Sequence, residues 1–127
     1  VHLGADDLLP ADVRPMLGAD CVVGQTVHNL DEARQAIEQS PDYIGVGPLF
    51  ETSTKEVGLP AAGPRFVETI REVTGAMPVF GIGGIALDNI AEVTAAGLRR
   101  VAVCGAVIGA ADPGAAAARI CEALEGG

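Results

Sequence analysis

The stretch Tyr43-Ile44-Gly45-Val46-Gly47-Pro48-Leu49-Phe50-Glu51-Thr52-Ser53-Thr54-Lys55 joins a short apolar run to a polar loop. The run at 43–46 has the length and apolar character of a buried strand. The loop after it carries hydroxyls and a lysine. Hydroxyls and backbone amides can donate hydrogen bonds to a phosphate, and the ammonium supplies charge. The stretch therefore predicts a phosphate site at the carboxyl end of a strand.

A second apolar run, Val79-Phe80-Gly81-Ile82, ends in the pair Gly83-Gly84. A residue without a Cβ lets the backbone approach a ligand closely. If the two strands are parallel, both loops lie at one edge of the sheet and can face the same ligand. The alternative is that the glycine pair forms only a tight turn from strand to helix.

Short apolar runs alternate with longer amphipathic ones along the chain, a pattern typical of βα units with a parallel sheet. The strands we expect are 1–3, 21–24, 43–46, 79–82 and 100–104. The helices we expect are 10–17, 29–38, 64–74, 87–96 and 113–124. Asn29 with Glu32 predicts a capping box, and Pro15 should kink or shorten the first helix.

The chain has 127 residues, about half the length of an eight-unit barrel. Val1 opens it inside an expected strand, and five parallel units cannot close as eight do, so two sheet edges would remain unpaired. We expect the chain to be part of a longer protein. A complete small open α/β domain is the alternative.

Lys and Arg number 8 against 17 Asp and Glu, which gives a net charge of −9. This charge disfavours nucleic acid and anionic membranes as partners, because both need a basic surface. No run has the length and apolarity of a membrane span or a signal peptide. The three cysteines have no metal-type spacing and are interpreted as reduced thiols of a cytoplasmic protein. Cys104 is interpreted as a small buried hydrophobe, with a nucleophile as the alternative.

Several stretches together resemble the thiamine-phosphate synthases and their relatives, the thiazole tautomerases. The matching pieces are His2-Leu3-Gly4 with Asp7, Gly24-Gln25-Thr26-Val27-His28, Asp42 to Pro48 running into Thr52-Ser53-Thr54-Lys55, Gly81-Ile82-Gly83-Gly84-Ile85, and Val101-Ala102-Val103. The resemblance implies a TIM (β/α)₈ barrel of which residues 1–127 form the last five βα units, as the carboxyl-terminal part of a single domain.

The resemblance also implies a reaction. A synthase of this family joins 4-amino-2-methyl-5-(diphosphooxymethyl)pyrimidine to a thiazole phosphate, giving thiamine phosphate and pyrophosphate, with Mg²⁺ on the diphosphate. Asp7 would be a magnesium ligand, and Thr26 and Lys55 would contact the diphosphate as catalytic residues. Taken alone, Asp7 could face solvent, Thr26 could be a turn residue, and Lys55 could be a solvated surface lysine.

The resemblance implies a second group of residues around the thiazole phosphate. They are Thr52, Ser53, Thr54, Gly84, Cys104 and Gly105. The chain departs from the family pattern at Ala5, where glutamine is common, at Glu51, which replaces a frequent proline, and at Gly105, where serine or arginine is common. These departures weaken the choice between synthase and tautomerase more than the choice of barrel.

His28 and His2 are the remaining candidates. Histidine at position 28 is an acid–base group in some tautomerases, and we favour a hydrogen-bonded structural role for it here. His2 is interpreted as a packing or supporting residue. The rival functions are a thiazole tautomerase without metal, a non-catalytic module that binds a thiazole phosphate, and another sugar-phosphate barrel enzyme. Because the amino-terminal half of the barrel would supply the pyrimidine site and the other magnesium ligands, we expect the isolated chain to be inactive.

Overall fold

The structure is a computed structural model that describes residues 1–52 and 60–126. Its strands are β1 (His2–Leu3), β2 (Gly24–Val27), β3 (Tyr43–Val46), β4 (Val79–Ile82) and β5 (Val101–Ala102). They form one open sheet in the order β1-β2-β3-β4-β5, and every neighbouring pair is parallel. The expected α/β class with a parallel sheet is confirmed.

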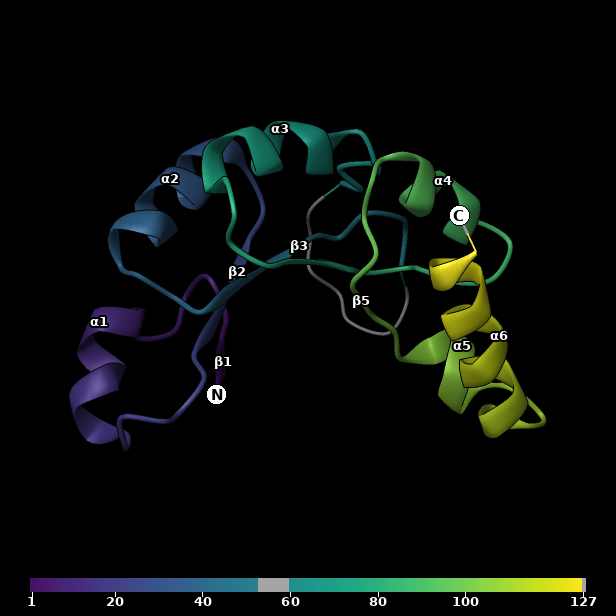
Figure 1. The fold of residues 1–127 in the computed structure, drawn as a ribbon, viewed down its shortest axis with the longest axis horizontal. Coiled ribbons are helices and arrows are strands. Elements are labelled where there is room, and N and C mark those ends of the chain that lie inside the picture. Colours follow the sequence, from purple (N-terminus) through teal and green to yellow (C-terminus); the bar gives the residue numbers. More distant parts are fainter. Residues whose placement is uncertain (53–59, 127) are drawn as a thin grey trace.

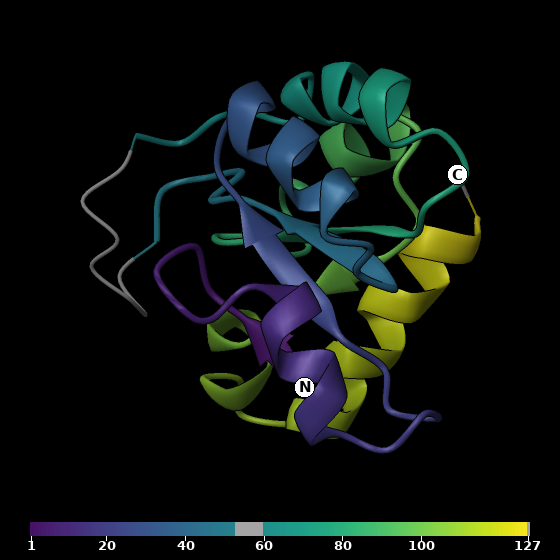
Figure 2. The same ribbon diagram turned by 90° about the vertical axis from the view of Figure 1, so that its left-hand side faces the viewer.

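Helices connect successive strands along the outer side of the curved sheet, and further helices follow the last strand (Figure 1). They are α1 (Pro10–Val13), the 3₁₀ helix η1 (Arg14–Met16), α2 (Leu30–Glu38), α3 (Phe66–Thr74), α4 (Ile90–Ala95), α5 (Gly105–Ile108) and α6 (Pro113–Glu125). Figure 2 shows α2 and α3 together over one face of the sheet. No helix in the described ranges has the length and apolarity needed to cross a bilayer.

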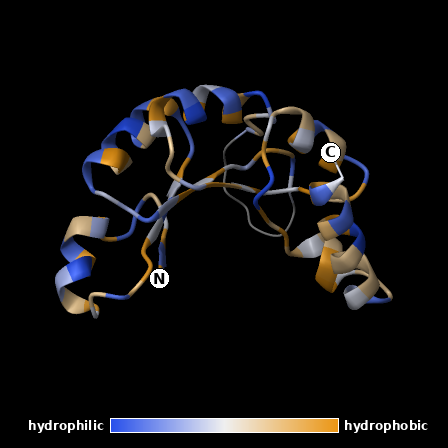
Figure 3. Ribbon diagram, in the orientation of Figure 1, coloured by the Kyte–Doolittle hydropathy of each residue, from blue (hydrophilic) through white to orange (hydrophobic). Residues whose placement is uncertain are grey.

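Alternation along each strand divides the side chains between two environments. Ile44 and Val46 of β3 are fully buried, and they pack with Val67 and Ile70 of α3 in the main core. Tyr43 projects from the opposite, inner face, as the strand period of two requires. Figure 3 shows the mixed polarity of the covering helices. Ala33 and Ala36 of α2 and Val93 of α4 are among their apolar residues buried in the main core. The inner face of the sheet therefore lies opposite the main core and carries other side chains, such as Tyr43.

Two helices begin at a side-chain cap, and the first of these caps is one half of the predicted capping box. The Asn29 side chain accepts a hydrogen bond from the Glu32 amide at the start of α2, and the Asp112 carboxylate accepts one from the Ala115 amide at the start of α6. Each side chain satisfies an amide that has no partner within the helix. Pro15 ends α1 early, as expected, since the chain continues from Val13 as a 3₁₀ turn.

Several expected boundaries are wrong. The second strand is 24–27 rather than 21–24, and Thr26 therefore lies within it instead of after it. Residues 87–89 precede α4 rather than opening it, and α3 begins at Phe66. The segment 105–108 is a short helix that the sequence pattern did not predict.

Candidate phosphate-binding site

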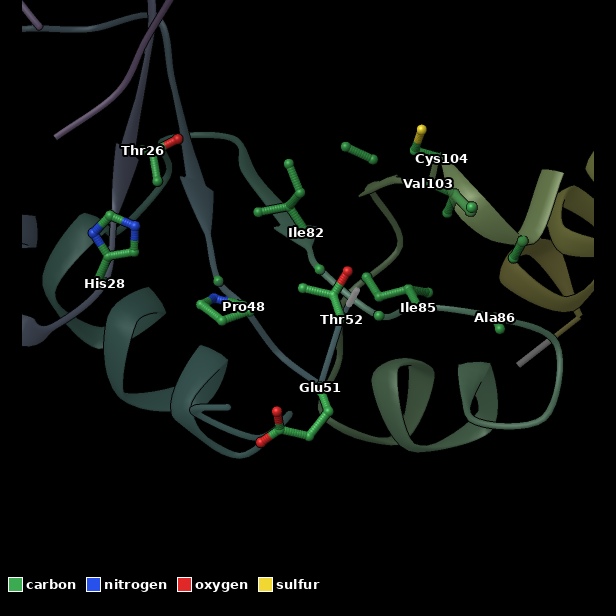
Figure 4. Close-up of a pocket in the computed structure, with 16 residues that line it drawn as sticks. Thr26, His28, Pro48, Glu51, Thr52, Ile82, Ile85, Ala86, Val103 and Cys104 are labelled. Carbon is green, nitrogen blue, oxygen red and sulfur yellow. The ribbon is translucent and has the colours of Figure 1, made fainter. Parts of the chain in front are cut away.

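A cavity of about 480 Å³ opens at the carboxyl edge of the sheet (Figure 4). It is lined by the ends of β2, β4 and β5 and by the loops that follow β3, β4 and β5. The lining residues that matter below are Thr26, His28, Glu51, Thr52, Gly84, Cys104 and Gly105. Ligands of open parallel sheets bind at this edge, so the cavity is the leading candidate site.

The loop after β3 is held against the end of β4 by backbone hydrogen bonds. The Leu49 amide donates to the Ile82 carbonyl at 2.9 Å, and the Phe50 amide donates to the Gly83 carbonyl at 3.1 Å. Gly47, which precedes a cis bond to Pro48, has no room for a side chain, because a Cβ there would overlap the Ile82 carbonyl. These contacts bring Thr52 to the cavity beside the β4 loop.

The glycine pair after β4 must be glycine for two reasons. Gly83 and Gly84 have φ angles of 90° and 64°, in the region that side chains disfavour. In addition, a Cβ on Gly84 would overlap the Glu51 carbonyl. Asn89 fixes the turn: its Nδ2 donates to the Gly84 carbonyl, and its Oδ1 accepts from the Ala86 amide, both at 2.9 Å. The pair is therefore a tight turn that also lines the cavity.

Thr26 lies on β2 at the cavity wall and is hydrogen-bonded to a histidine. Its Oγ1 is 2.7 Å from Nε2 of His2, whose Nδ1 is 3.0 Å from the Tyr43 hydroxyl. Partial burial lowers the pKa of His2 below the usual value for histidine. His2 does not line the cavity itself, which agrees with the supporting role expected for it.

His28 follows β2 and faces the same cavity (Figure 4). Its Nδ1 lies 3.1 Å from Oε2 of Glu32, which also accepts a hydrogen bond from the His28 amide at 2.8 Å. The second carboxylate oxygen of Glu32 accepts from Nδ2 of Asn29 at 2.6 Å. The hydrogen-bonded state expected for His28 is observed. Because Nδ1 is engaged, Nε2 is the nitrogen left for a ligand.

The segment after β5 forms the far wall. Cys104 is exposed there, so its interpretation as a buried hydrophobe is wrong. The alternation of β5 explains this, because Cys104 follows Ala102 on the inner side, whereas Val101 and Val103 pack against the core. Gly105 and Ala106, the first residues of α5, line the cavity. Backbone amides in the first turn of a helix are donors without helical partners.

Asp7 lies in the loop after β1, outside the cavity lining. It is exposed, and its Oδ2 accepts a hydrogen bond from the Gly4 amide at 2.6 Å. Within 1–52 and 60–126, no cluster of three or more His, Cys, Asp or Glu residues could hold a metal ion. A lone carboxylate fits only a cation such as Mg²⁺ that keeps phosphates and waters as its other ligands.

The cavity thus brings together the predicted residues Thr26, Thr52, Gly84, Cys104 and Gly105. Three further predicted residues, Ser53, Thr54 and Lys55, lie outside the described part of the chain. The apolar part of the lining had no predicted role and comprises Pro48, Ile82, Ile85, Ala86, Ala102, Val103 and Ala106. Position at the carboxyl end of a strand was the signal that could have found them.

A second cavity, of about 560 Å³, lies at the opposite edge of the sheet, before β4 and β5. Arg71, Arg99 and Arg100 are among the residues that line it. The Arg71 guanidinium donates to the Gly97 carbonyl, and that of Arg99 donates to the Thr94 carbonyl. Both carbonyls lie at the carboxyl end of α4, where cations stabilise a helix. These contacts give Arg71 and Arg99 a structural role.

Comparison with known proteins adds a family to this geometry. The family model described as thiamine monophosphate synthase matches residues 1–107. The thiamine-phosphate synthase of Anaeromyxobacter dehalogenans is 46% identical over 129 residues, covering 100% of this chain and 57% of that protein. The thiamine-phosphate synthase of Thermus thermophilus is 42% identical over 126 residues, covering 99% of this chain and 60% of that protein.

A solved structure agrees in fold. The chain superposes on thiamine phosphate pyrophosphorylase from Pyrococcus furiosus with a TM-score of 0.87 and 31% identity. That match covers 99% of this chain and 59% of the other. The chain therefore spans less than two thirds of the length of these relatives.

Proposed function

The chain belongs to the thiamine monophosphate synthase family, and on this premise we propose that residues 1–127 form the carboxyl-terminal part of a thiamine-phosphate synthase barrel. One observation carries the proposal. A single cavity at the carboxyl edge collects the hydroxyls of Thr26 and Thr52 and the backbone of Gly84 and Gly105. Donors of this kind from several loops suit a phosphorylated ligand.

The proposed reaction joins an aminopyrimidine methyl diphosphate to a thiazole phosphate and releases pyrophosphate. Thr52, Gly84, Cys104 and Gly105 surround the thiazole phosphate, together with Ser53 and Thr54. The apolar wall, including Ile82 and Ile85, covers the thiazole ring. Such walls exclude water and orient a ligand, while the few polar groups fix its position.

The bond that breaks joins the pyrimidine methylene to the diphosphate oxygen, and the electron pair leaves with the diphosphate. The thiazole nitrogen then attacks the cationic methylene and forms the new C–N bond. The chain contributes donors for the leaving group, Thr26 and Lys55, and orientation of the nucleophile. No protein nucleophile is needed, since positioning and charge stabilisation lower the barrier.

Magnesium would be held in part by Asp7, whose Oδ2 is fixed by Gly4. A divalent cation would neutralise charge on the departing diphosphate. The remaining ligands would come from substrate, water and residues outside this sequence. We further propose that residues outside this sequence form the rest of the barrel. We also propose that the protein acts in the cytoplasm with its cysteine thiols reduced.

A thiazole tautomerase is the second candidate, and the pairing of His28 with Glu32 favours it. Glu32 engages Nδ1, so Nε2 of His28 can accept a proton at the cavity. This arrangement suits an acid–base catalyst. A tautomerase of this kind would need neither the diphosphate substrate nor magnesium.

The test uses the purified full-length protein with both substrate pairs. A synthase releases pyrophosphate only when both substrates are present, and EDTA stops the release until Mg²⁺ is restored. A tautomerase isomerises its thiazole phosphate without pyrimidine and is indifferent to EDTA. Saturable binding of thiazole phosphate with neither turnover would instead identify a non-catalytic binding module.

A further inference from the structure

Tyr43, His2 and Thr26 form a hydrogen-bonded chain across the inner face of the sheet. The Tyr43 hydroxyl is 3.0 Å from Nδ1 of His2, and Nε2 of His2 is 2.7 Å from Oγ1 of Thr26. The His2 and Tyr43 rings are also stacked, with centroids 5.5 Å apart and an interplanar angle of 23°. Thr26 alone of the three lines the cavity.

The backbone leaves room for these three hydrogen-bonded side chains. His2 and Tyr43 are both in register with Gly24, which lies on the strand between them. A Cβ on Gly24 would overlap the Tyr43 ring. Gly45, in register with Thr26, is similarly constrained, because a Cβ there would lie 3.2 Å from Cε1 of His2. The two glycines therefore let the rings meet over β2.

A neutral imidazole carries one N–H, so the hydrogen bonds that link Tyr43, His2 and Thr26 can be donated in either of two directions. If Nδ1 carries the proton, it donates to the Tyr43 oxygen, and Nε2 accepts the Thr26 proton. If Nε2 carries the proton, it donates to Oγ1 of Thr26, and Nδ1 accepts from the Tyr43 hydroxyl. Only the second direction leaves the Thr26 proton for a ligand.

We propose that Tyr43 and His2 are positioning residues that make Thr26 a dedicated hydrogen-bond donor to an anionic ligand in the cavity. The Tyr43 O–H donates to Nδ1 of His2, and the Nε2–H donates to Oγ1 of Thr26. The Thr26 O–H then points to an anionic oxygen, which can only accept. In the opposite direction, an Oγ1 lone pair would face the anion. The anionic nature of the ligand rests on the proposed function.

Nuclear magnetic resonance of the wild-type protein tests the direction without any assay of turnover. The full-length protein is labelled with ¹⁵N-histidine, and the His2 ring signals are assigned by backbone correlation or by their loss in His2→Gln. With pyrophosphate as the probe, we expect a protonated Nε2 and an unprotonated Nδ1. A protonated Nδ1, or a doubly protonated ring at pH 7.5, would overturn the proposal even in an active synthase.

A double-mutant cycle tests the coupling to Thr26. Tyr43→Phe keeps the ring and removes only the hydroxyl, and we expect it to lower affinity for pyrophosphate by roughly 3- to 10-fold. The same substitution in a Thr26→Ala background should change affinity less than about 2-fold, since no donor remains to be positioned. Equal losses in both backgrounds would contradict the proposal. Thr94→Ala, which removes a hydroxyl on α4 bonded to the Ala91 carbonyl, is the control and should leave affinity unchanged.

Discussion

Oε2 of Glu32 accepts hydrogen bonds from both the backbone amide and the Nδ1 of His28, at 2.8 and 3.1 Å. The Glu32 carboxylate thus caps the start of α2 and also orients the His28 ring at the cavity. In the usual capping box this carboxylate would reach the amide of the cap residue Asn29. Here it reaches one residue further back, so the stability of α2 and the geometry of the site depend on the same side chain.

Replacing Glu32 by alanine should therefore lower the free energy of unfolding by about 1 kcal/mol, because the His28 amide loses its acceptor and the helix loses a cap. Urea denaturation of the full-length protein measures this change. Glu38→Ala, at the other end of α2, is the matched control and should have a much smaller effect. Equal losses in the two variants would show that the hydrogen bonds of Glu32 with His28 contribute no specific stability.

For the proposed synthase, Asp7→Asn should reduce turnover at limiting Mg²⁺ by at least about tenfold, which corresponds to about 1.4 kcal/mol. Asparagine retains an oxygen that can accept from the Gly4 amide, so the loop should keep its conformation while the charge is lost. The apparent requirement for Mg²⁺ should rise.

Asp6→Asn is the control for Asp7, since it removes an equally exposed carboxylate one residue away. It should leave the Mg²⁺ requirement unchanged. Parallel losses in the two variants would assign the effect to the general negative charge of this loop. No loss in Asp7→Asn would remove Asp7 from the proposed magnesium site.

Gly84→Ala should destabilise the loop after β4 by about 1 to 3 kcal/mol, because alanine at a φ of 64° is strained and its Cβ would overlap the Glu51 carbonyl. Thiazole phosphate should bind more weakly, since the turn forms the cavity wall. Calorimetric titration and urea denaturation give the two readouts. Gly18→Ala, where a Cβ meets nothing within 4 Å, should change neither.

The hydrogen bonds of Asp42 predict that the stability of the protein depends on pH. The Val23 amide donates to its carboxylate at 2.7 Å and the Arg14 guanidinium at 2.9 Å, and together they lower the pKa of Asp42 below its ordinary value. A lowered folded-state pKa stabilises the protein above the unfolded-state pKa of about 4, and this contribution is lost as pH falls through the folded-state value.

Asp42→Asn should consequently be less stable than wild type at pH 7, and the difference should shrink below about pH 4. Thermal unfolding across this range measures it. Asp20→Asn, which changes an exposed carboxylate, is the control. If the stability difference between Asp42→Asn and wild type stays constant from pH 7 to pH 3, the charge of Asp42 does not contribute to stability.

The sequence predicted the strands whose apolar runs coincide with the paired residues. Residues 43–46 and 79–82 were placed correctly because both strands carry apolar residues that the helices bury. The second strand was misplaced because its pairing begins at Gly24, and its Thr26 faces the site rather than the core. An apolar run therefore marked 21–24, although Val22 is 57% exposed.

The site was predictable where a motif combined residue type with a position at a strand end. The cavity collects Thr52, Gly84 and Gly105 in this way. The hydrogen bonds that link Tyr43, His2 and Thr26 were not predictable, because they depend on which residues of three strands share a register. Cys104 was misjudged because side chains after β5 alternate between the core and the inner side, and Cys104 follows Ala102 on the exposed inner side.

The most direct test is a crystal structure of the full-length protein with thiazole phosphate bound. The account predicts the phosphate at the carboxyl edge, within hydrogen-bond distance of the backbone at Gly84 and Gly105 and beside Thr52. A phosphate in the cavity at the opposite edge, beside Arg71 and Arg100, would contradict it.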